Sequence, residues 1–240
     1  MVEERSAHHP TRPMQRATRH LRARLGLALT ALFLVACDAG SNPFASFEAR
    51  CAELPPSRFQ VAVVPIAYAE DETQSIDQLN LRSGHTPGVH LTFGLTTVNF
   101  SHQTQIEIRS VENRRGAGAC GTLNVDVTLS MQPMTIYLAQ ELDGSPCARA
   151  ATMEHELQHV AVFRDVLDGA ARELTADLGG TIGLGLQRAA SQAELQRQLN
   201  ARVNDYLSGV FHRHKLAMEE RQQGVDSPAE YARVKAACAS

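Results

Sequence analysis

A His-Glu-x-x-His motif, made by His155, Glu156 and His159, is the clearest candidate for chemistry in this 240-residue sequence. On a helix, residues four positions apart lie one above the other on the same face, so the two imidazoles can offer nitrogen ligands to a single metal ion. The intervening Glu156 is then placed beside a metal-bound water, where it can act as a general base. The motif therefore predicts a site that activates water.

The residues around the motif extend this interpretation. Six positions within and around the motif are uncharged: Thr152, Met153, Leu157, Gln158, Val160 and Ala161. This pattern resembles the longer signature of the zincin metallopeptidases, and the general plan of the chain resembles predicted secreted zinc proteases of bacteria. The strand-like segment 135–138 also resembles the zincin arrangement, in which an edge strand beside the site pairs with an extended peptide substrate. The resemblance implies one zinc ion, a peptide or protein substrate and peptide-bond hydrolysis.

A catalytic zinc ion needs a third protein ligand and an open position for water. The segment 169–177, with Glu173, resembles the ligand helix of thermolysin-like gluzincins, although the interval after the motif is about six residues shorter. On a continuous helix Glu173 would lie about 21 Å along the axis from His159. Glu173 can therefore bind the ion only if the helix breaks between Arg164 and Gly169, and Gly169 permits such a break.

Two other residues are alternatives for the third ligand. Asp165 has the metzincin spacing, but on an unbroken helix it lies about 240° round the axis from His159, so we reject it. His214 shares a helix face with apolar residues and is the runner-up to Glu173, while a hydrogen-bonded core histidine is the more common role for such a residue. Glu173 and His214 both remain open at this point.

The motif lies where strand-like sequence gives way to helical sequence. Segments rich in alternating apolar and polar residues predict an antiparallel sheet of about five strands, at 59–68, 89–95, 105–109, 123–129 and 134–138. After Pro146 the composition predicts helices: one from about Arg149 that carries the motif, one from Ser191 to about Gln222, and a short one after Ser227. Strands followed by helices predict an α+β domain over 58–240, strand-rich over 58–140 and helical over 147–240.

The N-terminal segment has the features of an export signal. Residues 1–36 contain an arginine-rich stretch followed by a short apolar core, which predicts a secretory signal peptide. The run 34–37 resembles a bacterial lipobox, in which Cys37 becomes the acylated first residue of the mature protein. Residues 37–57 are then a tether. These features predict an exported protein of the bacterial cell envelope, lipid-anchored to a membrane and facing the periplasm or the cell exterior.

Charge and cysteine content agree with export. The leader holds six arginines against two glutamates, so the net charge of −3 becomes −7 once the leader is removed. No basic stretch remains to neutralise phosphates, which argues against a nucleic-acid partner. Apart from Cys37, four cysteines remain, the number expected for two disulfides in an exported protein, with all three pairings open: Cys51, Cys120, Cys147 and Cys238.

The sequence supports two functions of different kinds. The first is a zinc-dependent peptidase, with His155 and His159 on the metal and Glu156 as the base. The alternative is a non-catalytic envelope lipoprotein that binds a partner and whose metal site is structural or absent. A closed fourth coordination position would favour the alternative.

Overall fold

The computed structural model describes residues 45–240 except 87, 89–90, 184 and 239–240. The predicted signal peptide and the predicted lipidation site Cys37 lie outside the described residues. The described residues belong to one unit, Ser41–Ser240. Within the described part of the chain, no helix has both the length and the apolar character needed to cross a membrane.

A five-stranded sheet is organised around one long central strand. Its strands are β1 Arg58–Val63, β2 Ala69–Asp71, β3 Gly94–Glu112, β4 Ala119–Leu138 and β5 Gln187–Ala189. β3 pairs antiparallel with almost all of β4, while β1 and β2 pair with β4 in the parallel direction and β5 pairs antiparallel with its first residues. The α+β class and the number of strands are confirmed, but the individual strands differ: 89–95 overlaps only the start of β3, which also contains 105–109, and β2 and β5 were not predicted. The expectation of a purely antiparallel sheet is wrong, because alternation reports which face of a strand is buried and not the strand's direction.

The alternating sequence pattern of β4 matches the burial of its side chains. Its residues Leu123, Val125, Val127 and Leu129 are at most 1% exposed, and the polar residues between them face away from the core. The segments 123–129 and 134–138, expected as two strands, form one strand that continues through Pro133. The pairing with β3 shifts register between Val98 and Phe100, where β4 has one extra residue beside the proline, which has no N–H to donate to the ladder.

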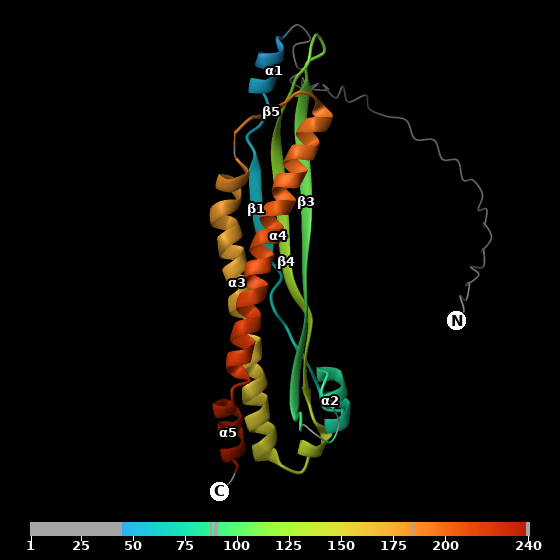
Figure 1. Ribbon diagram of the computed structural model, residues 1–240, viewed down its shortest axis with the longest axis vertical. Helices are drawn as coiled ribbons and strands as arrows, with labels where there is room; N and C mark the ends of the chain where they lie inside the picture. Colours follow the sequence, from blue (N-terminus) through green and yellow to red (C-terminus); the bar gives the residue numbers. More distant parts are fainter. Residues whose placement is uncertain (1–44, 87, 89–90, 184, 239–240) are drawn as a thin grey trace, which may run out of the picture. The chain divides into compact units, whose positions relative to one another are not determined.

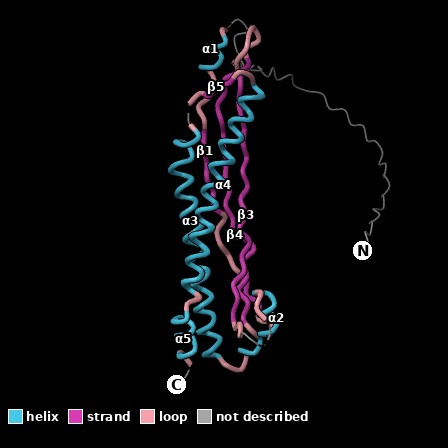
Figure 2. The backbone as a smooth tube through the Cα atoms, viewed as in Figure 1, coloured by secondary structure: helices cyan, strands magenta, loops and turns pink. Residues whose placement is uncertain are grey.

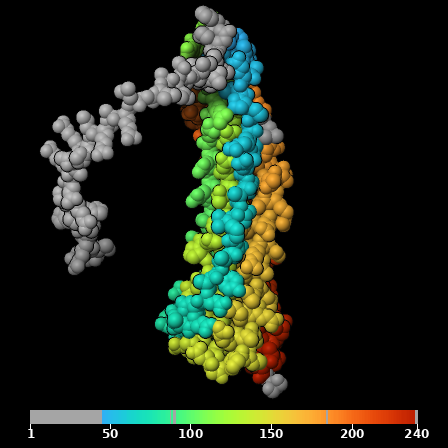
Figure 3. All heavy atoms as spheres, turned by 180° about the vertical axis from the view of Figure 1, so that it is seen from behind, coloured from blue at the N-terminus to red at the C-terminus, as the bar shows by residue number. Residues whose placement is uncertain are grey.

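Two long helices pack with the sheet as a second layer, and a short C-terminal helix packs against the first of them (Figures 1 and 2). They are α3 Pro146–Ile182, α4 Gln192–Val225 and α5 Pro228–Ala236. The helix starts expected at Ser191 and Ser227 are confirmed, and both residues are N-caps: the hydroxyl of Ser191 accepts from the Glu194 N–H at 3.2 Å and that of Ser227 accepts from the Glu230 N–H at 3.3 Å. From behind, β1 lies between β4, with which it pairs, and α3, which packs against it (Figure 3). One face of the sheet is therefore covered by helices.

α3 runs without a break through Gly169, where the sequence permits one. The glycine serves packing instead, because a Cβ at this position would lie 3.2 Å from the His214 ring of α4. The close approach of α3 and α4 at this point explains why a small residue is needed there. The helix is thus continuous for 37 residues.

Two disulfides fasten the ends of the unit, as the cysteine count predicts. Cys51–Cys120 joins the helix α1 Phe47–Ala52 to β4, and Cys147–Cys238 joins the start of α3 to the residues that follow α5. The expected tether 37–57 is therefore too long at its C-terminal end, because α1 is a capped helix bonded to the sheet. The remaining helix, α2 Ile76–Ser83, precedes β3.

Candidate metal centre

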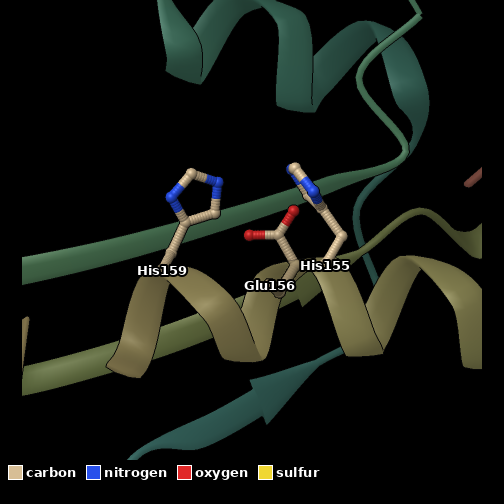
Figure 4. A group of neighbouring side chains, drawn as sticks. All are labelled: His155, Glu156 and His159. Carbon is tan, nitrogen blue, oxygen red and sulfur yellow. The ribbon is translucent and has the colours of Figure 1, made fainter. Parts of the chain in front are cut away.

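The first half of α3 brings the three motif residues together (Figure 4). The rings of His155 and His159 project from the same side of the helix, and the Glu156 carboxylate lies between them. One potential ligand atom from each residue lies within 4.8 Å of the others. His155 is 6% exposed and Glu156 is 3% exposed, so polar groups that water would normally solvate are held inside the protein. These three residues could hold a metal ion.

The motif opens onto a cleft of about 620 Å³. One wall is the chain around the start of β3, including Phe93, Gly94 and Thr96, and the opposite wall comes from the end of α4 and from α5, including Asp226 and Tyr231. Both apolar and polar side chains line it. The cleft is of a size that admits a small molecule or a few residues of a peptide.

Asp226, which the sequence analysis missed, contacts both histidines. It is the residue at which α4 ends. Its Oδ1 atom lies 3.4 Å from Nε2 of His155 and 3.3 Å from Nε2 of His159, and it accepts a hydrogen bond from the Tyr231 hydroxyl at 2.9 Å. One carboxylate oxygen therefore faces the same nitrogen of both imidazoles.

The other ring nitrogens are held by separate partners. Nδ1 of His155 faces Oε1 of Glu230 at 3.5 Å, and Gln158 donates to the same oxygen at 2.7 Å. Nδ1 of His159 bonds to Oε1 of Gln222, whose amide nitrogen donates to the His159 carbonyl at 3.3 Å. Because Glu230 and the Gln222 oxygen can only accept, each Nδ1 is the donor. This arrangement fixes the ring orientations and directs both Nε2 atoms toward Asp226.

Glu156 is positioned by β3. Its Oε2 atom accepts a hydrogen bond from the Thr96 hydroxyl at 2.7 Å. Burial raises the pKa of Glu156, and this effect outweighs the lowering caused by Thr96 and by the neighbouring histidines. Gly94 lies directly against the carboxylate, because a Cβ there would lie 2.9 Å from Cδ of Glu156 and 2.7 Å from Cγ2 of Thr152.

The charges at the site attract a cation. The hydrogen bond to Asp226 raises the pKa of His155, and for His159 the bonds to Asp226 and Gln222 outweigh the lowering due to burial. Burial alone would raise the pKa of Asp226, but the two histidines hold it below its ordinary value. The cluster therefore favours positive charge between the imidazoles and the carboxylate.

Glu173 and His214, the two candidates for the third ligand, contact each other and not the residues of the motif. Glu173 lies on the unbroken part of α3, so it could not turn back to His159. Its carboxylate bonds to Nε2 of His214 at 2.8 Å and pairs with Arg213. The expectation that either residue completes the metal site is therefore corrected: both belong to a polar contact between α3 and α4.

No local pattern marked Asp226 as a site residue. It lies 67 positions after His159, just before the Ser227-Pro228 helix start, and an aspartate at a helix boundary normally suggests only capping. The rejected Asp165 forms an ion pair with Arg221 at 2.7 Å on the surface. Only the packing of α4 against α3 brings Asp226 to the motif.

The predicted substrate edge is also corrected. The segment 135–138 belongs to β4, whose residue Thr135 pairs with Ala69 of β2 on one side and Thr97 of β3 on the other. No backbone edge is left there for a peptide. Among the described strands, β3 pairs with β4 alone, so its outer edge is the free one beside the cleft.

Comparison of the chain with protein-family models, with curated proteins and with solved structures found no match.

Proposed function

We propose that this protein is a zinc-dependent peptidase, in which His155 and His159 bind the ion and Glu156 is the general base. The observation that carries the proposal is the convergence of two buried imidazoles and a buried carboxylate on one open cleft. Imidazole and carboxylate groups are ligands that zinc prefers, and an open cleft suits a catalytic site better than a structural one. Zinc, when bound, supplies the Lewis acidity that makes water a nucleophile at neutral pH.

The protein's own groups prepare Glu156 for proton transfer. Thr96 occupies Oε2, which leaves Oε1 free to accept a proton from water in the cleft. A raised pKa makes the carboxylate a stronger base. Gly94 has no side chain, so the start of β3 lies directly against this carboxylate.

A peptide substrate and an envelope location complete the proposal. The peptide substrate follows from the zincin resemblance of the motif and from the size of the cleft. The two disulfides indicate an oxidising, exported environment. Anchoring through lipid on Cys37, with the domain facing the periplasm or the cell exterior, follows from the lipobox-like sequence.

The replacement Glu156→Gln tests the role of the base. The purified variant should retain zinc and lose hydrolysis of a fluorescent casein substrate by at least about 100-fold, since general bases contribute on the order of 10²–10⁴ in rate. Glu220→Gln, an exposed change on α4, is the control and should behave as the wild type. Equal hydrolysis by Glu156→Gln and wild type would exclude Glu156 as the base, and no hydrolysis by wild type would favour the binding lipoprotein.

A further inference from the structure

We propose that Asp226 is the third protein ligand of the metal site, an inference that rests on the proposed function. Neither the motif nor the resemblance assigns this residue. The assignment follows from three observations: the distances around the Asp226 carboxylate, the hydrogen-bonding roles of the histidines, and the way the end of the chain holds Asp226 in place.

The distances match the edges of a tetrahedral site. Two ligands that each lie about 2.0–2.1 Å from a tetrahedral zinc ion are roughly 3.3 Å apart. Asp226 Oδ1 is 3.4 Å from Nε2 of His155 and 3.3 Å from Nε2 of His159. The two edges that join Asp226 to the histidines therefore already have the tetrahedral separation. Glu173, by contrast, is engaged with Arg213 and His214.

The hydrogen-bonding roles require a positive charge at the centre of these atoms. Each histidine uses its Nδ1 proton for an acceptor-only partner, Glu230 or the Gln222 oxygen. A neutral imidazole then presents a bare lone pair at Nε2, directed at a carboxylate oxygen that is also a lone-pair acceptor. Three lone pairs that face one another repel unless a cation lies among them. Protons on the Nε2 atoms or one metal ion can supply this positive charge, and the metal ion is the one that binds all three atoms together.

Asp226 is held in place by the last helix. Tyr231 of α5 donates to Oδ1 of Asp226, and Glu230 of the same helix supports His155. This is the arrangement of outer groups that orient metal ligands. The nine-residue α5 has no buried residue of its own, so its position depends on the Cys147–Cys238 disulfide and on ion pairs such as Arg233–Glu154 at 3.4 Å. The disulfide thus fastens the part of the chain that supplies the ligand.

The test is the zinc dissociation constant of the full mature chain, measured by competition with a chromophoric chelator. Asp226→Asn and Asp226→Ala should each weaken zinc binding by on the order of 100-fold or more, because loss of an outer-shell group alone costs 10–100-fold. Both should also change the visible absorption spectrum of the Co²⁺-loaded protein, which reports the ligand set. Asp205→Asn, an exposed change on α4, is the matched control, and circular dichroism verifies folding.

The outcomes separate this inference from the proposed function. If wild type binds zinc, His155→Ala abolishes binding, and both Asp226 variants stay within about threefold of wild type, Asp226 is not a ligand and the proposed function stands. An unchanged Co²⁺ spectrum in Asp226→Asn also overturns the assignment. If wild type itself binds no zinc, the assignment and the proposed function both fall.

Discussion

Replacing Gly94 with alanine tests how the structure holds the catalytic carboxylate. The new Cβ would lie 2.9 Å from Cδ of Glu156 and 2.7 Å from Cγ2 of Thr152, both on the rigid helix α3. Since carbon atoms pack at about 3.5–4.0 Å, the carboxylate must move by roughly 1 Å. A misplacement of about 1 Å at a reacting group costs on the order of 100-fold in rate, or about 2.7 kcal/mol of barrier. We therefore expect kcat to fall about 100-fold.

The same substitution should spare the metal and cost some stability. The three atoms nearest to the new methyl group belong to Glu156 and Thr152 and not to the histidines, so zinc content should stay at the wild-type level. Overpacking should lower the free energy of unfolding by about 1–3 kcal/mol, measured by chemical denaturation. Gly144→Ala is the control, because a Cβ at Gly144 meets nothing within 4 Å. If Gly94→Ala folds and keeps kcat within about threefold of wild type, the reasoning about Glu156 is refuted.

Three further predictions follow from the supports of the site. Removing the Cys147–Cys238 disulfide with the double replacement Cys147→Ser and Cys238→Ser should weaken zinc binding by about 10–100-fold, because α5 is then no longer bonded to α3. Chelator competition measures the affinity, and an unchanged affinity would contradict this role of the disulfide. The Arg213 contact lowers the pKa of Glu173 below 4.5, so its ionised form stabilises the fold above pH 4.5 and that contribution is lost as the pH falls below this value. In thermal unfolding, Glu173→Gln should therefore lose less stability than wild type as the pH falls, and it should bind zinc as wild type does. A loss of zinc binding in this variant would show that Glu173 is a ligand after all. Adding zinc at 100 times its dissociation constant should stabilise wild type by about 2.7 kcal/mol and leave His155→Ala unchanged in calorimetry; an equal shift in both would place the bound zinc elsewhere.

Local rules were enough to predict much of the fold. Alternation along 123–129 located the core face of β4, and the caps at Ser191 and Ser227 located two helix starts. The even number of cysteines predicted two disulfides. Each of these features depends on residues close together in the sequence or on a simple count, so one sequence is enough to reveal it.

Features that depend on long-range packing were not predictable in the same way. The parallel direction of β1 relative to β4 depends on how the intervening chain crosses the sheet. The continuity of α3 at Gly169 depends on contact with α4. Asp226 reaches the histidines only because α4 packs against α3 and ends beside His155 and His159. A ligand brought in by tertiary packing leaves no spacing signal in the sequence.

The measurement that tests the central claim most directly is the zinc content of the purified mature chain and of its His155→Ala variant. His212→Ala, which alters an exposed histidine on α4, serves as the control. We predict one zinc ion per chain in wild type and in His212→Ala and none in His155→Ala, by mass spectrometry of the metal after gel filtration. No zinc in wild type, or equal zinc in wild type and His155→Ala, would contradict the proposal that this motif is a metal site.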